Sequence, residues 1–239
     1  MLVSSQAIVM QSIKFADTKQ IVQLFTSCQG RLACIVQGIG SKKSKNKAAF
    51  FLPLTLLEIE FDYRTNRSLQ QVKEIRIAEP LHDLRINTAK NAISLFLGEI
   101  LCTTLKEGEH NSQIYDFLRL SILYFEHQTE QFHNFHLLFL TQLLRYLGIS
   151  PINNYTTATP YFDVSISQYV STQNTKTLNK ELSELFHHII LQNSYLQPDL
   201  QINRIQRNSL LDALVSYYTQ HFPGFRNLQS LAILRELFA

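Results

Sequence analysis

The first 80 residues follow the two-residue alternation of apolar and polar positions that is typical of β-strands. The clearest case spans residues 55–63, where Leu57, Ile59 and Phe61 alternate with acidic residues. Successive side chains of a strand point to opposite faces, so this pattern predicts one apolar and one acidic face. Apolar residues predict three further strands, at residues 7–10, 20–26 and 31–37, and alternation of Ile75 and Ile77 with charged residues predicts a last one at 69–77.

Turn signals separate these strands. Gly30 ends the polar stretch after residues 20–26, and glycine supplies the positive φ that a tight hairpin turn needs. Residues 64–67 are polar and predict a second turn. Five short strands predict a small antiparallel barrel, and the OB-fold has five. An SH3-like barrel fits this pattern nearly as well.

After Pro80 the apolar positions recur at intervals of three and four residues, which predicts amphipathic helices. Ser209 and Asp212 have the spacing of a capping box and predict a helix that begins there. Residues 151–176 are rich in Thr, Ser and Asn and predict an irregular excursion. Strands followed by helices predict an α+β protein with two domains, residues 1–80 and 81–239. The predicted helices span residues 89–105, 114–125, 132–147, 178–191, 209–221 and 227–238.

Composition excludes several protein classes. No apolar run reaches the roughly 18 residues of a transmembrane helix, and the N-terminus lacks the pattern of a signal peptide. The three cysteines include no C-x-x-C pair, so we expect neither a disulfide framework nor a thiolate zinc site. A reducing cytoplasm fits this cysteine usage.

Positive charge is concentrated in the strand-rich part. Residues 1–80 hold 11 of the 22 Lys and Arg residues but only 6 of the 19 acidic ones, whereas the remainder is slightly acidic. Such an asymmetry indicates a polyanionic partner for the basic part, although a difference of this size also arises by chance.

One segment carries most of this charge. Four lysines, at positions 42, 43, 45 and 47, fall within six residues after Gly38 and Gly40. A basic loop of this kind can follow nucleic-acid phosphates without reading bases, and its binding weakens with salt because counterions are released. Neighbouring aromatic side chains could stack on bases. The candidates are Phe15, Phe50, Phe61 and Tyr63, of which Phe61 is expected in the core.

No enzymatic or metal-binding motif accompanies these features. Gly38 and Gly40 do not form a Walker A or dinucleotide motif, so we expect no ATP hydrolysis. Glu130, His133 and His136 lack the H-E-x-x-H spacing and are expected on the solvated surface. We therefore expect no enzyme activity, no metal and no cofactor.

The chain resembles the RecO family of bacterial DNA repair and recombination mediators in the order of several short motifs. The resemblance spans essentially the whole chain. Its motifs are Thr18–Thr26 followed by Gly30-Arg31, Gly38–Lys45 leading to Phe51-Leu52-Pro53-Leu54, Glu99-Ile100-Leu101, Leu143–Ile149 and Leu228-Gln229-Ser230.

The resemblance implies an N-terminal OB-fold and a helical C-terminal domain. It also implies binding of single-stranded and duplex DNA, annealing without ATP, and a cytoplasmic location with the nucleoid. The implied protein partners are RecR, the C-terminal tail of single-strand-binding protein, and the complex that loads the recombinase RecA. The resulting phosphate contacts would be Arg31, Lys42, Lys43, Lys45 and Lys47, with Arg64 and Arg67 added by charge and position.

Two points of the resemblance stay open. Arg119 and Arg145 are the charge-based candidates for contact with a protein partner. Many members of the family carry a four-cysteine zinc module after the helix that ends in Leu-Gly, but residues 151–176 contain neither Cys nor His. We therefore expect no zinc.

The alternative interpretation of the whole chain is a helical protein-interaction module with an incidental small barrel.

Overall fold

The structure is a computed structural model that describes all residues except 17, 38–48, 131, 193–199 and 238–239. The chain forms two compact units. The first comprises Met1–His127 and Leu228–Leu237, and the second contains Gln128–Asn227. The strand-rich region thus shares its unit with the helices that follow it and with the last helix. The division into domains at residue 80 stays a prediction.

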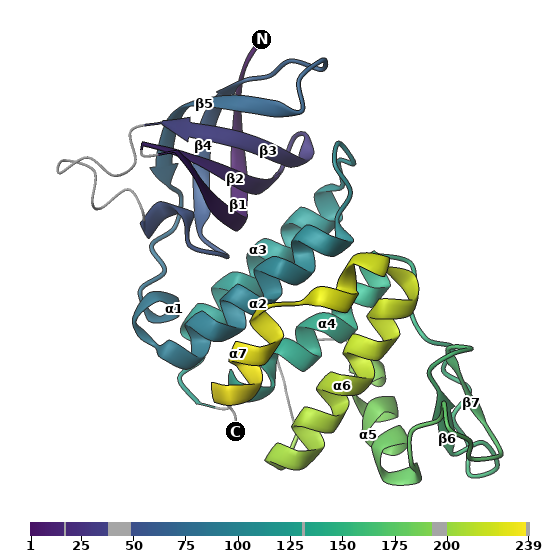
Figure 1. Ribbon diagram of the computed structural model, residues 1–239. Helices are drawn as coiled ribbons and strands as arrows, with labels where there is room; N and C mark the ends of the chain where they lie inside the picture. Colours follow the sequence, from purple (N-terminus) through teal and green to yellow (C-terminus); the bar gives the residue numbers. More distant parts are fainter. Residues whose placement is uncertain (17, 38–48, 131, 193–199, 238–239) are drawn as a thin grey trace. The chain divides into compact units, whose positions relative to one another are not determined.

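The N-terminal strands close into a barrel in the order β1-β2-β3-β5-β4 (Figure 1). All neighbours are antiparallel except β3 and β5, which run parallel. This closed five-stranded barrel, followed by helices, confirms the predicted α+β architecture with an N-terminal OB-fold. The strands are β1 (Leu2–Ala16), β2 (Lys19–Thr26), β3 (Gly30–Gln37), β4 (Leu56–Asp62) and β5 (Leu69–Ile77).

Closure depends on the length of β1. Its first half pairs with β4, from Leu2 to Ile8, and its second half pairs with β2, from Ala7 to Ala16. A register shift between Val9 and Gln11 lies where the partner changes, and bulges of this kind increase strand twist. The core inside is apolar and includes Val9, Leu24, Cys34, Leu57 and Phe61.

In the described part of the first unit, the barrel is accompanied by the helices α1 (Asp83–Ile86), α2 (Thr88–Thr104), α3 (Ser112–His127) and α7 (Ser230–Leu237). The side chain of Asn87 caps α2 by accepting from two backbone N–H groups. Lys90 is fully buried, ion-paired with Asp83, and donates to the Glu126 carbonyl at 2.9 Å. Burial of this cation is tolerated because it is paired and hydrogen-bonded.

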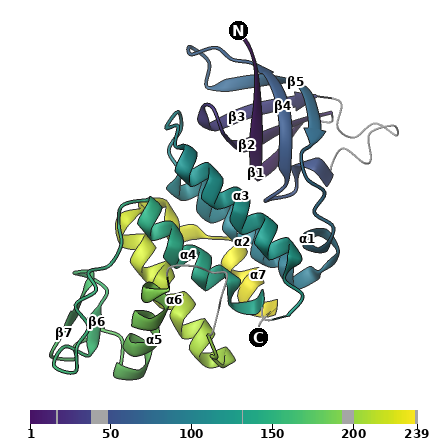
Figure 2. The same cartoon turned by 180° about the vertical axis from the view of Figure 1, so that it is seen from behind.

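Two glycines allow close backbone contacts within this unit. A Cβ at Gly98 of α2 would lie 2.2 Å from the Met10 carbonyl oxygen of β1. Gly30 has a φ of +66° in the predicted β2–β3 turn, and a Cβ there would lie 2.1 Å from the Glu109 carbonyl oxygen. Helix α2 and the α2–α3 loop therefore pack directly on barrel backbone (Figure 2).

The second unit is mainly helical. Its elements are η2 (Phe132–Asn134), α4 (Phe135–Tyr146), β6 (Tyr161–Asp163), β7 (Gln168–Val170), α5 (Lys180–Leu191), α6 (Arg204–His221) and η3 (Pro223–Asn227). The predicted start of α6 at Ser209 is wrong. The capping box is formed by Asn203 and Gln206 instead, so the helix begins five residues earlier.

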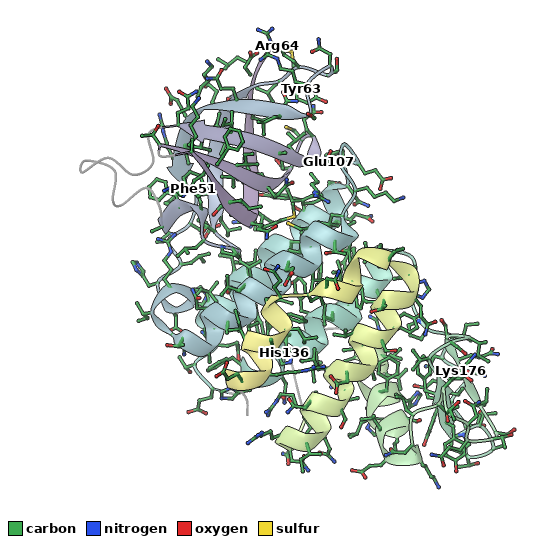
Figure 3. The ribbon with its side chains drawn as sticks, in the orientation of Figure 1. Phe51, Tyr63, Arg64, Glu107, His136 and Lys176 are labelled. Atoms are coloured by element: carbon green, nitrogen blue, oxygen red, sulfur yellow. The ribbon has the colours of Figure 1, made fainter. Side chains whose placement is uncertain are left out.

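The expectation of a solvated His136 is also wrong. All side chains from Phe135 to Leu144 of α4 are buried, so this helix has no solvated face along most of its length. His136 is fully buried (labelled in Figure 3), whereas His133 is exposed. Burial, together with the charges of Arg207 and His133, lowers the pKa of His136 to about 3.

Residues 151–179 contain two short strands, β6 and β7, that the sequence did not predict. Side-chain amides and carboxylates hold this segment. Asn154 exchanges two hydrogen bonds with the backbone of Tyr169, at 2.8 and 2.9 Å. The Asp163 carboxylate accepts from Ser165 and Asn174, and these hydrogen bonds keep the pKa of Asp163 below its usual value against the opposing effect of burial.

Candidate nucleic-acid interface

The β4–β5 turn is held by one buried amide. Gln70 is 3% exposed, and its Nε2 donates to the carbonyls of Arg64 at 3.0 Å and Arg67 at 2.6 Å. Its Oε1 accepts from the Arg64 N–H at 2.9 Å. This side chain, with the hydrogen bond from the Arg67 N–H to the Arg64 carbonyl at 3.1 Å, holds the backbone of the turn that presents Arg64 and Arg67 to solvent. Gln70 was missed in the sequence because it has no charge and belongs to no motif.

Arg64 has a local acidic partner. Its Nε donates to Asp62 at 3.1 Å, and the N-terminal ammonium lies 3.3 Å from the same carboxylate. The ammonium first, and Arg64 after it, hold the pKa of Asp62 below its usual value. The Arg64 side chain remains 52% exposed, so its outer face is still accessible (Figure 3). Arg67 is exposed on the same turn.

Arg31 faces inward, toward the end of α2. Its guanidinium donates to the carbonyls of Cys102 at 2.5 Å and Leu105 at 2.9 Å, and to the Gln23 side chain at 3.3 Å. Glu107 lies 4.0 Å away. A cation at the C-terminus of a helix stabilises its unpaired carbonyls. The position thus gives Arg31 a structural role, and its contact with phosphate stays a prediction.

The four lysines at positions 42, 43, 45 and 47 lie outside the described residues. The chain on either side of them is described, and Gln37 at the end of β3 pairs with Lys19 at the start of β2. Lys14 pairs with Gln20, the next residue of β2. Gln37, the last described residue before the lysine-rich segment, therefore lies opposite Lys19, and Lys14 lies one strand further away. We call Lys14, Lys19 and Gln37 the basic edge.

The basic edge and the β4–β5 turn are separate. Strands β3 and β5 run parallel, with Ala33 paired to Leu69 at the start of β5. The turn with Arg64 and Arg67 therefore precedes the β3–β5 pair, whereas the lysine-rich segment follows it. Arg64 and Arg67 therefore lie at the opposite end of this pair of strands from Gln37, the last described residue before the lysine-rich segment.

The aromatic candidates for base stacking fall into a buried and a more exposed group. Phe61 is fully buried in the barrel, as expected, and Tyr63 packs edge-to-face against it with ring centroids 6.2 Å apart. Phe15 is 62% exposed, next to Lys14 on the basic edge. Phe50 is half-buried. The surface of the barrel thus offers Phe15 and Phe50 to a base. Lys14 and Lys19 were not singled out in the sequence because they lie apart from the lysine cluster and only strand pairing aligns them.

The two arginines proposed for protein contact belong to different units. Arg119 on α3 is ion-paired with Glu79. Arg145 at the end of α4 donates to the Ile190 carbonyl of α5 and to Gln142. Both side chains thus have intramolecular partners, and their contact with another protein stays a prediction.

Among the described residues, no group of three or more His, Cys, Asp or Glu side chains could hold a metal ion. No helix in the described part of the chain is long and apolar enough to cross a membrane.

Comparison with known proteins agrees with the two-part fold. The family model for the N-terminal part of recombination protein O matches residues 1–81, and that for its C-terminal part matches residues 87–231. The DNA repair protein RecO of Bacteroides fragilis is 34% identical over 256 residues, and the match covers both chains completely. The proteins of the same name from Flavobacterium psychrophilum and Phocaeicola vulgatus are 32% and 31% identical over 241 residues, again with complete coverage. The chain therefore belongs to the RecO family of DNA repair proteins.

Proposed function

We propose that the protein binds single-stranded DNA through the basic edge of its barrel and acts as a recombination mediator without enzymatic chemistry. The observation that carries this proposal is the pairing of Lys19 with Gln37, after which the lysine-rich segment begins, with Lys14 on the adjacent strand β1 opposite Gln20. Charges gathered on adjacent strands can follow a phosphate backbone independently of base sequence.

The distribution of acidic residues supports the same side of the barrel as the DNA-binding side. Glu58 and Glu60 of β4 pair with Arg76 and Glu74 of β5, so three carboxylates share the outer surface of these two strands. A polyanion is repelled there. We infer that a DNA strand avoids the outer surface at Glu58, Glu60 and Glu74 and follows β1, β2 and the end of β3.

Membership of the family suggests the finer steps of the proposed activity. The protein would anneal complementary strands without ATP, bind duplex DNA as well, and associate with the nucleoid. It would recognise the C-terminal tail of single-strand-binding protein, pair with RecR and help to load RecA. Arg119 and Arg145 stay candidates for the protein contacts.

The test is fluorescence anisotropy of a labelled single-stranded oligonucleotide, titrated with salt. Three proteins are compared with the wild type: Lys14→Gln with Lys19→Gln, the four-lysine variant in which positions 42, 43, 45 and 47 become Ala, and a control with Lys176→Gln and Lys180→Gln. The control removes the same charge as the first variant from exposed positions of the other unit (Lys176 is labelled in Figure 3).

We expect tight binding by the wild type, with a logarithmic salt slope that falls by roughly 0.7 for each phosphate contact removed. The basic-edge and four-lysine variants should both show this fall, and the control should not. If the control lost as much affinity and salt dependence, the effect would come from overall charge and not from these positions. Absence of wild-type binding at low salt would contradict the proposal and favour the helical protein-interaction module.

A further inference from the structure

Strands β3 and β5 separate after a short parallel ladder. Their last pair is Ile35 with Gln71, although β3 continues to Gln37 and β5 to Ile77. A bulge accompanies the separation: Phe61 of β4 pairs with Val72 and Glu60 pairs with Glu74, which leaves Lys73 as the extra residue of β5. Bulges redirect the side chains around them.

The gap between the separated strands is a pocket of about 210 Å³. The apolar part of its lining includes Phe51, which is 2% exposed and belongs to the barrel core (labelled in Figure 3). Phe50 is half-buried, so part of its ring remains accessible. The pocket is lined by Val36, Gln37, Phe50, Phe51, Gln71, Val72, Lys73 and Ile75.

The polar lining groups have complementary abilities. Gln37 and Gln71 each carry an amide that can donate and accept hydrogen bonds. Lys73 is exposed and donates to the Gln71 Oε1 at 3.4 Å, which holds both groups on the same side of the pocket. An aromatic wall, two amides and one ammonium match the three parts of a nucleotide: a flat ring, its polar edge and its phosphate.

The size and position of the pocket restrict the kind of ligand further. Sites for drug-sized ligands occupy roughly 300–1,000 Å³, so this smaller pocket suits a single ring system. Gln37 also belongs to the basic edge, so a strand bound there would pass the entrance. An apolar side chain of a protein partner would use the wall but not the amides or the ammonium.

We propose that this pocket receives one unpaired nucleobase from the bound strand. Phe50 stacks on the base, the amides of Gln37 and Gln71 contact its edge, and Lys73 contacts the adjacent phosphate. This inference rests on the proposed binding of single-stranded DNA. It adds a reason for preferring single strands, since a base held in a duplex cannot enter.

The test compares the dissociation constants of a labelled oligothymidine and of an abasic strand of equal length. The proteins are the wild type, Phe50→Leu, Phe50→Tyr and Gln71→Leu, with Phe222→Leu as a matched control at a half-buried phenylalanine of the other unit. Circular dichroism checks the fold of each. Stacking of one base on an aromatic side chain, worth about 1–3 kcal/mol, predicts about a five- to 150-fold preference for the base-bearing strand in the wild type.

We expect Phe50→Leu to lose at least about fivefold of this preference without a change in salt slope, because no phosphate contact is removed. Phe50→Tyr should keep the preference, Gln71→Leu should weaken it, and the control should match the wild type. Equal wild-type affinity for both strands, or a full preference in both Phe50→Leu and Gln71→Leu, would overturn the pocket assignment while leaving DNA binding intact. Binding of neither strand would overturn both proposals.

Discussion

The carboxylate of Glu99 caps the helix that begins at Ser230, at the far end of the chain. It accepts from the backbone N–H groups of Gln229 and Ser230, each at 2.9 Å, and from the Ser230 hydroxyl. Helix α7 thereby returns to α2, and the two lie side by side in both views (Figures 1 and 2). Two motifs of the family resemblance, at Glu99 and at Leu228–Ser230, thus meet in one hydrogen-bonded contact.

Replacement of Glu99 by Gln should lower the free energy of unfolding by about 1–2 kcal/mol, as for loss of a helix cap. The amide keeps an acceptor but loses the charge that favours a helix N-terminus. Urea denaturation measures the change. Glu236→Gln, at an exposed position of the same helix, is the control and should be nearly neutral. Equal stability of the Glu99 variant and the wild type would show that the cap contributes little.

Replacement of Gln70 by Leu should destabilise the barrel by roughly 1–3 kcal/mol, because the turn loses all three hydrogen bonds from this side chain. Hydrogen exchange should also become faster at the Arg64 amide. Gln6→Leu, at an exposed site on β1, provides the matched control. Unchanged exchange at Arg64 would mean that the turn is held by other contacts.

The stability of the second unit should depend on pH through His136. Its pKa falls from the ordinary 6.5 to about 3 on folding, first through burial and then through Arg207 and His133. Below pH 6.5 the unfolded chain therefore binds a proton at this imidazole that the folded chain does not bind. The contribution of His136 to the free energy of unfolding is fully present above that pH and decreases as the pH falls toward 3.

Through this one group, the free energy of unfolding at pH 5 should be roughly 2 kcal/mol lower than at pH 7.5. Denaturant titrations of the wild type and of His136→Leu at both pH values measure this change. The variant should show little difference in the free energy of unfolding between the two pH values. His82→Gln, at an exposed position, should retain the wild-type dependence. A wild-type pH dependence in the Leu variant would contradict the assignment to His136.

The three cysteines should differ in reactivity. Burial raises the pKa of Cys34 to about 12 and that of Cys102 to about 11. Cys34 is buried, whereas Cys28 and Cys102 are half-buried. The thiolate is the reactive form, so iodoacetamide near pH 8 should modify Cys28 first and leave Cys34 protected until the barrel unfolds. Peptide mass spectrometry with and without urea checks this order. Modification of Cys34 as fast as Cys28 in the native protein would contradict it.

The positions of the main elements could be predicted from local pattern. Leu57, Ile59 and Phe61 alternate with acids, and the structure places them in the barrel core. Gly30 has the positive φ that the predicted turn required. Such features depend on side-chain period and backbone sterics, which act over a few residues. The start of α6 was mispredicted because the true cap, Asn203, precedes the apolar periodicity.

The arrangement of the candidate site required the tertiary structure. Only strand pairing brings Lys19 beside Gln37, with Lys14 on the next strand, and separates them from Arg64. Only packing turns Arg31 toward the carbonyls of α2 and buries His136. These outcomes join residues that are distant in sequence, because pairing register and the packing of helix faces depend on the fold as a whole. The fold class and the excess of positive charge in the strand-rich region follow from the sequence alone, whereas the spatial grouping of those charges follows from strand pairing.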